Sequence, residues 1–185
     1  MTPIHKSGPR NKCSNFRPIA ITSCVGRIME RVIYRSILEY FESNATLQST
    51  QHGFIPGYSI ETAGITFLDL LTRSVDTGKL ADAVFLDYAK AFDTVPHSLL
   101  LEKLRDHGVA GILLSWISDY LQGRTQVVKI NNSFSDPTPI QSGVFQGSVL
   151  GPLLFVVFID DIDSCVSNSA IVKYADDWKL LVTFD

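Results

Sequence analysis

Three aspartates beside apolar segments are the residues of this chain with the clearest chemical potential. Asp87 ends the apolar run at residues 83–86, and Asp176 with Asp177 separates two further apolar runs. An unpaired carboxylate loses hydration near apolar strands, and adjacent carboxylates also repel each other. A divalent cation removes both costs, because hard cations such as Mg²⁺ take oxygen ligands. Two such ions about 4 Å apart can clamp the attacking and leaving oxygens of a phosphoryl transfer.

Taken alone, the three acids also have a purely structural interpretation. The pair at 176–177 suits a hairpin turn, and Asp87 suits a helix cap. The choice between the two depends on the elements that position the acids and on the residues around them.

Hydrophobic periodicity predicts the helices of the chain. Apolar residues recur at helical spacing in five segments, at residues 25–41, 60–75, 98–106, 112–121 and about 149–160. The first of these should bury one face. The last should be a buried helix that Ser148 can cap.

The strands are expected to carry the acids. Residues 83–86 form a continuous apolar run, which predicts a buried central strand ending in Asp87. Residues 171–174 and 178–182 predict two strands around the acidic turn. Elsewhere we expect a loop or edge strand over 1–18, loops over 51–59 and 143–147, and a strand over 125–130 that Asn131 and Asn132 turn into a hairpin. Mixed elements with antiparallel pairing predict an α+β fold with helices on one face of a sheet.

Composition limits the classes of protein that fit. Apolar residues make up 45% of the 185 residues, which supports a packed interior. The net charge of −3 argues against a nucleic-acid binder. Basic residues nevertheless crowd the first forty positions, at Lys6, Arg10, Lys12, Arg17, Arg27, Arg31 and Arg35. This distribution suits phosphate binding, although a solvated positive face explains it equally well.

Targeting and redox signals are sparse. The three cysteines lie far apart and form no CxxC pair, which argues against a disulfide framework or zinc site and fits a reducing compartment. We find neither a signal peptide nor an apolar stretch long enough to span a membrane. We therefore expect an intracellular protein without a membrane partner, and the sequence does not choose between nucleus and cytoplasm.

Five motifs in order resemble those of the reverse transcriptases of non-LTR (LINE-type) retrotransposons. Residues 84–97 (VFLDYAKAFDTVPH) resemble the first palm motif, residues 143–152 (GVFQGSVLGP) the second, and residues 174–177 (YADD) the third. Residues 15–19 (NFRPI) and 51–54 (QHGF) resemble finger motifs of the same family. A lone acidic pair is a weak signal, whereas five ordered motifs that cover almost the whole chain are a strong one.

The resemblance implies a right-hand polymerase that makes DNA on an RNA template. Its palm would be an antiparallel sheet packed on helices, with fingers in residues 1–80 and palm in residues 81–185. The expected partners are an RNA template, a DNA primer and dNTPs. The expected cofactors are two Mg²⁺ ions, with Mn²⁺ as a possible substitute. The chain then looks cut short at both ends, without the thumb and endonuclease domains of such elements.

The resemblance also implies residue roles at the metal site. Asp87 and Asp176 would hold both ions, with Asp177 close by and the backbone carbonyl of Tyr88 as a further ligand. Phe92 would lie beneath the incoming sugar and exclude a 2′-hydroxyl, although core packing explains an aromatic residue here as well.

Further roles concern the nucleotide and the template. Gln146 and Gly147 would lie near the nascent base pair. Arg17 would contact the triphosphate, because its planar fork suits phosphate. Lys6 would lie near the template, as would the finger-motif pair Gly53 and Phe54.

The chain departs from the family at a few positions. Phe145 replaces the usual proline of the second palm motif, and Trp178 replaces a small polar residue after the acidic pair. In the finger motif, Ile55 and Tyr58 stand where basic residues are usual. These changes leave the acids intact but put loop geometry and template grip in question.

Other noticeable residues are expected to be structural. The acids at 160, 161 and 163 should end a helix in solvent, and the apolar stripe from Ile112 to Tyr120 should be core. Trp178 should pack beside the hairpin, and His52, His97 and His107 should make local hydrogen bonds.

Three functions compete on this sequence. The first is a metal-dependent polymerase, and the second is an inactive retrotransposon remnant with at most weak RNA binding. The third, an RNA-dependent RNA polymerase, is disfavoured by Phe92 and by Ala175.

Overall fold

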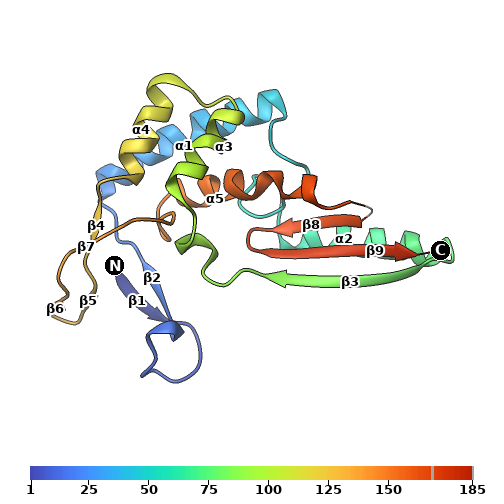
Figure 1. The fold of residues 1–185 in the computed structure, drawn as a ribbon, viewed down its shortest axis with the longest axis horizontal. Helices are drawn as coiled ribbons and strands as arrows, with labels where there is room; N and C mark the ends of the chain where they lie inside the picture. The colour runs from blue at the N-terminus through green and yellow to red at the C-terminus, as the bar shows by residue number, and fades with distance from the viewer. Residues whose placement is uncertain (168, 185) are drawn as a thin grey trace.

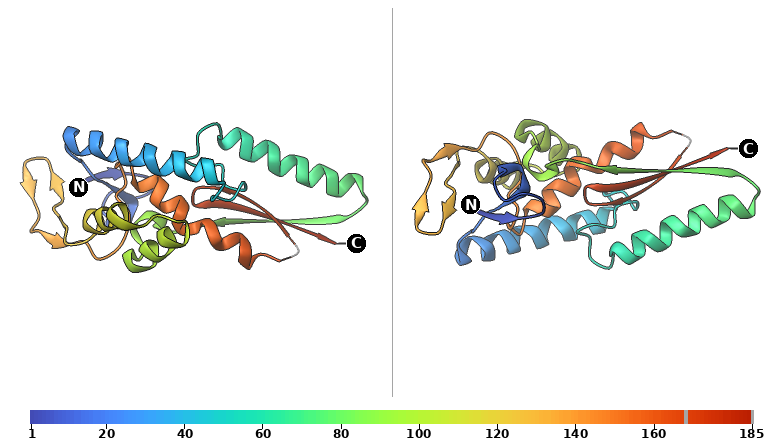
Figure 2. Two further views of the ribbon diagram at one scale, coloured as in Figure 1. Left: turned by 90° about the horizontal axis from the view of Figure 1, so that it is seen from above. Right: turned by 90° about the horizontal axis from the view of Figure 1, so that it is seen from below.

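The fold combines helices with antiparallel strands, as expected for an α+β protein (Figures 1 and 2). The computed structural model describes residues 1–167 and 169–184. In chain order the helices and strands are β1 (Thr2–His5), β2 (Phe16–Ile19), α1 (Cys24–Asn44), α2 (Ile60–Asp76), β3 (Leu80–Asp87), α3 (His97–Asp106), α4 (Gly111–Leu121), β4 (Thr125–Gln126), β5 (Lys129–Ile130), β6 (Ser133–Phe134), β7 (Thr138–Pro139), α5 (Gly151–Ile159), β8 (Ser169–Tyr174) and β9 (Asp177–Phe184). Short 3-10 turns lie at η1 (Cys13–Asn15), η2 (Ala91–Asp93) and η3 (Asp160–Cys165).

The acids are carried by a three-stranded antiparallel sheet in the order β3-β9-β8. Helix α2 packs against all three strands, and Phe67 and Leu181 are buried between the helix and the sheet. Figure 1 shows the sheet extending away from the other helices, with α2 behind it. The predicted strands around the acidic turn are therefore confirmed.

The prediction that residues 83–86 form a buried central strand is wrong. The acidic turn folds β9 between β3 and β8, so that β9 is the central strand and β3 lies at an edge. Phe85 is 67% exposed and Val84 is 42% exposed. A continuous apolar run cannot by itself distinguish a central strand from an edge strand, because both alternate across the same pleat.

The larger core lies between α1, α3, α4 and α5, and α5 is its central element. Residues Leu153, Leu154, Phe155, Val156 and Val157 of α5 are all buried. A helix that is apolar on every side belongs in an interior. Ile37, Leu38 and Phe41 of α1 join the same core, so the predicted fingers and palm portions share one interior.

Ser148 contacts the first residue of α5 as predicted, although the residue directly before the helix is Leu150, which makes no side-chain capping bond. The Ser148 Oγ accepts a hydrogen bond from the Gly151 N–H at 2.9 Å. The buried Glu30 carboxylate of α1 accepts from the N–H groups of Val149 at 2.7 Å and Leu150 at 3.2 Å. An acid at this position satisfies N–H groups that the helix leaves unpaired and favours its dipole.

Two apolar stripes are less buried than predicted. The N-terminal half of α1 leaves Val25, Ile28, Met29 and Val32 between 51% and 77% exposed. In α4, Ile112 is 91% exposed, although Ile117 of the same stripe is fully buried. Periodicity identifies an apolar face, but it does not show how far along the helix that face is covered.

The predicted hairpin at Asn131 and Asn132 is confirmed. It joins β5 to β6, with Ile130 paired to Ser133. The single strand expected over residues 125–130 is instead two short strands, since β4 pairs with β7 separately. At the chain start, β1 pairs with β2 as a two-stranded antiparallel sheet, which fits the predicted edge strand.

The acids at 160, 161 and 163 were expected in solvent, which is correct for Asp161 and wrong for the buried Asp160 and the largely covered Asp163. They belong to a set that we call the charged layer, made of Lys103, His107, Asp160, Asp161, Asp163 and Lys173. Lys173 of β8 is fully buried and forms an ion pair with Asp163. His107 Nε2 lies 3.1 Å from Asp160 Oδ2, and Lys103 pairs with Asp161. The charged layer joins η3 to α3 and to the strand that precedes the acidic turn.

Within residues 1–167 and 169–184, no helix has both the length and the apolar character that crossing a bilayer requires.

Candidate active site

The strand register brings the three predicted acids to one end of the sheet. Asp87, the last residue of β3, is paired directly with Asp177, the first residue of β9. Tyr174 pairs with Asp177 on the other side, so Ala175 and Asp176 alone form the turn between β8 and β9. Directly paired residues of antiparallel strands point to the same face, with Cβ atoms roughly 5 Å apart. Asp87 and Asp177 are therefore neighbours, and Asp176 is adjacent in the turn.

The electrostatics of Asp177 agree with this proximity. Partial burial raises the pKa of Asp177, and the negative charges of Asp176 and Asp87 raise this pKa further. The positive charges of Lys179 and Lys6 oppose the rise. The acids thus repel one another at neutral pH, and a cation among them would relieve the repulsion.

The donor set fits a hard divalent cation in its chemistry. Asp87, Asp176 and Asp177 offer carboxylate oxygens only, the ligand type that Mg²⁺ prefers. Among the described residues, no three or more His, Cys, Asp or Glu side chains already stand close enough together to form a metal site. The carboxylates would therefore have to converge on an ion rather than receive it in a finished cage.

Trp178 is buried next to the acidic turn and forms a hydrogen bond to it. Its side chain is only 4% exposed, and its indole Nε1–H donates to the Ala175 carbonyl oxygen at 2.9 Å. Its ring lies 4.6 Å from the ring of Tyr88, between centroids. The prediction that Trp178 packs beside the hairpin is confirmed, and the residue that departs from the family pattern helps to shape the turn.

Phe92 lies in an aromatic row. Its ring stacks on Phe155 of α5 with centroids 4.6 Å apart, and meets the edge of Phe54 at 5.9 Å. The packing role expected for Phe92 is confirmed. Its ring remains partly exposed, as does Phe54 at 44%. The predicted contact with an incoming sugar stays a prediction.

The loop at residues 143–147 is anchored to both η2 and the end of β2. The Gln146 amide donates to Asp93 Oδ1 at 3.1 Å, and its backbone oxygen accepts from the Ala20 N–H at 2.7 Å. Burial raises the pKa of Asp93, although the bond from Gln146 opposes the rise. Gly147 has a φ of +96°, and a Cβ there would lie 2.9 Å from the Ala20 oxygen. Glycine is thus required for this close approach.

Phe145, at the position where proline is usual, is buried in the same loop. Its ring meets Tyr120 edge-on at 5.5 Å, and the Arg124 guanidinium lies 4.4 Å above it. Phe145 is therefore part of the packing between the loop and α4, and it leaves Gln146 and Gly147 in contact with β2.

The two predicted basic contacts lie on the β1–β2 hairpin. Arg17 of β2 is exposed and pairs through its backbone with Ile4. Lys6 follows β1 and is also exposed. In Figure 1 this hairpin lies beyond the end of the sheet that carries the acids. The positive charge of Lys6 acts to lower the pKa of Asp177, whereas Arg17 is not among the groups that shift this pKa.

Gly53 of the predicted finger motif lies directly against the acidic turn. A Cβ at Gly53 would be 2.3 Å from the Ala175 nitrogen, closer than any side chain allows. The adjacent Gln51 is 2% exposed, and its Oε1 accepts from the N–H groups of Gly53 and Ala175. Sequence reasoning missed Gln51 as a site residue, although the motif that carries the resemblance begins with it.

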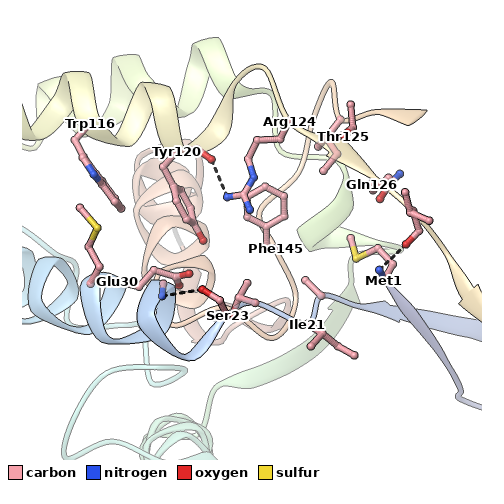
Figure 3. Close-up of a pocket in the computed structure, with 16 residues that line it drawn as sticks. Met1, Ile21, Ser23, Glu30, Trp116, Tyr120, Arg124, Thr125, Gln126 and Phe145 are labelled. Atoms are coloured by element: carbon pink, nitrogen blue, oxygen red, sulfur yellow. Dashed lines mark hydrogen bonds between the residues drawn. The ribbon is translucent and has the colours of Figure 1, made fainter. Parts of the chain in front are cut away.

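Two hollows on the surface differ in the residues that line them. One of about 230 Å³ lies beside the acids, and Asp87, Asp177, Trp178 and Lys179 are among its lining residues. The other, of about 510 Å³, is lined from α1, α4 and β4, and its walls include Glu30, Tyr120, Arg124 and Phe145 (Figure 3). None of the three acids lines the larger hollow, so its size alone does not make it the active site.

Comparison with known proteins identifies a family and several relatives. Residues 4–184 match the family described as reverse transcriptase (RNA-dependent DNA polymerase). The probable RNA-directed DNA polymerase from transposon BS of Drosophila melanogaster is 33% identical over 96% of the chain and 20% of its own length. The RNA-directed DNA polymerase from mobile element jockey of the same species is 30% identical, with the same two coverages. The chain thus spans about a fifth of the length of these curated relatives.

Solved structures show the same fold at low sequence identity. Apo telomerase from Candida tropicalis, truncated from its C-terminal domain, matches with a TM-score of 0.61 and 12% identity over 85% of this chain and 34% of its own. Telomerase from the same organism in complex with a TWJ fragment of telomeric RNA matches with a TM-score of 0.62 and 12% identity, over 82% and 28% of the two chains.

Proposed function

The chain belongs to the reverse transcriptase (RNA-dependent DNA polymerase) family, with relatives among non-LTR retrotransposon polymerases, and we propose that it supplies the fingers and palm of such an enzyme. Residues 1–80 would be the fingers portion and residues 81–185 the palm portion. The reaction would add dNTPs to the 3′-hydroxyl of a DNA primer paired with an RNA template.

One observation carries the proposal beyond family membership. The β3–β9 register pairs Asp87 with Asp177, and the turn places Asp176 next to them. Acids from two segments about ninety positions apart therefore meet at one end of one sheet. A hairpin turn or a helix cap would need only one of these segments, so the structural interpretation of the acids does not explain their pairing.

The acids would hold the divalent ions on which the family depends. Asp87 and Asp176 would bind both Mg²⁺ ions, with Mn²⁺ as a substitute, and Asp177 and the Tyr88 carbonyl would lie close by. When bound, the two ions would favour attack by the primer 3′-hydroxyl and steady the leaving pyrophosphate, with no covalent intermediate on the protein.

The nucleotide would be positioned by the residues around the acids. The stacking of Phe92 on Phe155 holds its ring in place, which supports a role in excluding a 2′-hydroxyl from the sugar. The tether of Gln146 to Asp93 supports a place near the nascent base pair. Positioning of this kind supplies much of the rate in phosphoryl transfer, since the reacting groups are held in line.

The strands and loops at the edges of the site would contact nucleic acid. Arg17 would bind the triphosphate, and Lys6 would bind the template, as their exposure on the β1–β2 hairpin permits. Gly53 and Phe54 would line the template path, with the exposed Phe54 ring available to a base.

Primer extension tests the proposal directly. The purified chain is given a DNA primer on an RNA template, dNTPs, and Mg²⁺ or Mn²⁺. Asp176→Asn should reduce extension on the order of 100-fold or more, because it removes a metal-binding charge without changing volume. Asp136→Asn is the matched control, since Asp136 lies in the exposed β6–β7 loop, and it should leave extension unchanged.

The outcomes separate the competing functions. Extension that needs Asp176 would establish the polymerase. If the chain alone is inactive but gains activity when a family thumb is appended, the chain contains a competent palm that lacks duplex grip. If neither form extends a primer while circular dichroism shows a folded chain, the inactive remnant is the better account. Incorporation of ribonucleotides in preference to deoxynucleotides would instead favour an RNA polymerase.

A further inference from the structure

The start of the finger motif, with Thr50 before it, lies beside β8 and pairs with it at one isolated bridge. The His52 N–H donates to the Lys173 oxygen at 2.8 Å, and the Lys173 N–H donates to the Thr50 oxygen at 2.8 Å. Gln51 and Lys173 form an isolated parallel bridge. The segment therefore covers the outer edge of β8 immediately before the acidic turn.

A side chain extends this pairing one step further, into the turn itself. Gln51 Oε1 accepts from the Gly53 N–H at 2.7 Å and from the Ala175 N–H at 3.0 Å. Ala175 has a φ of +55°, the left-handed region that a residue with a Cβ seldom adopts. Its carbonyl oxygen is bound by the indole of Trp178. Both backbone polar groups of the residue before Asp176 are thus held by side chains.

The absence of a side chain at Gly53 makes this contact possible. The Cβ of any other residue would fall 2.3 Å from the Ala175 nitrogen and 3.0 Å from the Tyr174 carbonyl carbon. These are backbone atoms, so the obstruction cannot be relieved by turning a flexible side chain. Gly53 and Gln51 therefore act together, one by leaving room for the turn and the other by binding it.

We infer that Gln51 is a positioning residue that fixes the acidic turn to the finger motif. Without its oxygen, the buried N–H groups of Gly53 and Ala175 would lose their acceptor, and the turn would lose the contact that keeps Ala175 in its left-handed conformation. Gln51 would not touch substrate or metal. The consequence for catalysis rests on the proposed function, whereas the restraint on the turn does not.

The amide of Ala175 gives a direct readout of this restraint. Hydrogen exchange is followed by NMR in the ¹⁵N-labelled chain. In the unmodified chain, the Gly53 and Ala175 amides should exchange through a common opening, because both depend on the same oxygen. Divergent opening free energies for these two amides, measured in increasing denaturant, would contradict the inference without any substitution.

Three substitutions and a control sharpen the test. Gln51→Met keeps the length of the side chain but removes the acceptor, and should speed exchange at Ala175 by about tenfold or more. Gln51→Glu keeps an oxygen at the same reach and should retain most of the protection. Gly53→Ala keeps Gln51 but pushes the turn away, and should speed exchange as Gln51→Met does. Gln122→Met, at an exposed position after α4, should have no effect.

The double variant of Gln51 and Gly53 measures whether the two residues act through the same contact with the turn. If they do, Gln51→Met combined with Gly53→Ala should speed exchange little more than either change alone, since the first already breaks the contact. Unchanged protection of Ala175 in a folded Gln51→Met chain would overturn the inference, as would independent effects that multiply. Gly53→Ala supplies the same test if Gln51→Met does not fold.

Catalysis provides the second readout. In primer extension, with a thumb appended if the chain requires one, Gln51→Met should lower kcat about tenfold and raise the Mg²⁺ concentration for half-maximal rate, with KM for dNTP changed less than about threefold. Gln51→Glu should restore part of kcat. A loss confined to KM would contradict positioning of the acids. If even Asp176→Asn leaves activity intact, the proposed function fails, while the exchange result at Ala175 still decides the restraint.

Discussion

The two sides of the β8–β9 hairpin, the acidic turn and the charged layer, differ in whether their acids are paired with cations. At the end of the sheet that carries the acidic turn, which we call the open end, Asp87, Asp176 and Asp177 are neighbours of like sign. Partial burial and their mutual repulsion raise the pKa of Asp177. Beneath β8, the charged layer is more deeply buried except at Asp161, and its acids face cations. Lys173 meets Asp163, and the other two pairs join α3 to η3. The contrast lies in pairing rather than in the residues themselves, since both sites are rich in aspartate.

The difference separates the acids that maintain the fold from those that we propose take part in catalysis. A buried charge is tolerated when a partner and hydrogen bonds replace its hydration. Asp163 has such partners in Lys173 and the hydroxyl of Thr50, and Asp160 accepts from the Gln48 N–H at 3.0 Å. Carboxylates that gather without a cation between them cost stability, and a fold keeps them where a ligand compensates.

The largest expected effect comes from breaking the ion pair of Lys173, which is the most deeply buried charged residue among those described. Lys173→Met should lower the free energy of unfolding by roughly 3–5 kcal/mol, because it leaves the Asp163 carboxylate buried beside an apolar group. For a domain of this size that loss corresponds to a Tm roughly 10 °C lower. Thermal unfolding followed by circular dichroism measures it, and Lys12→Met, at an exposed loop position, is the control.

The double variant distinguishes a lost pair from a lost methylene chain. Lys173→Met with Asp163→Leu removes both charges and should recover much of the stability, since neither charge is then left alone. If the double variant is as unstable as Lys173→Met, packing around the lysine stem matters more than its charge. The charged layer would then differ from the open end of the sheet in burial rather than in pairing.

The sequence predicted most helices and the acidic site but not the charged layer. Helix ends and the β8–β9 turn were foreseen because they depend on residues close in sequence, such as Ser148 and the acidic pair. The burial of Asp160 and Asp163 was not predicted because their cations come from α3 and β8, and local spacing gives no information about such partners. The central position of β9 was missed for a similar reason, since strand order depends on how the hairpin folds back on β3.

In the candidate active site, too, the sequence predicted the local motifs but not the contacts between distant segments. The motifs located the three acids and Gly53, because the family resemblance maps them residue by residue. They did not reveal that Gln51 binds the turn, or that Trp178, at an unusual position, donates to it. Gln51 reaches the turn from a distant part of the chain, and the indole of Trp178 reaches back across the turn, so both contacts depend on the folded structure.

A smaller effect should appear in the pH dependence of the charged layer. The hydrogen bond that the His107 Nε2–H donates to the Asp160 carboxylate raises the pKa of His107, and this effect outweighs the opposing effect of burial. Because the folded pKa lies above the unfolded value, this bond contributes fully below about pH 6.5 and is lost as the pH rises through the folded pKa. The contribution should be about 1 kcal/mol, typical of a partly exposed bond to a charged group.

Denaturant titrations at pH 6 and pH 8.5 measure this contribution. The unmodified chain should lose the stabilisation between the two values, whereas His107→Gln and Asp160→Asn should each remove that component of the pH dependence. If both variants keep the same dependence as the unmodified chain, another group in the charged layer titrates instead.

The smallest effect should have the opposite sign, and it lies at the open end of the sheet. Asp177→Asn removes one of three neighbouring negative charges, so without divalent ions at pH 7 it should stabilise the fold, by less than about 1 kcal/mol because the group is exposed and screened. Since the folded pKa of Asp177 is raised, the unmodified chain should itself gain stability as the pH falls through that pKa, and Asp177→Asn should not share this gain. Thermal unfolding in EDTA measures the sign.

Adding millimolar Mg²⁺ should then make the unmodified chain more stable than Asp177→Asn. An ion that binds only the folded state stabilises it by mass action, and its binding needs the carboxylates that otherwise repel one another. Asp136→Asn, changed in the same way outside the site, should alter neither result. If Asp177→Asn instead destabilises the metal-free chain, the open end would already be a paired site like the charged layer, and the contrast between the two sides of the hairpin would fail.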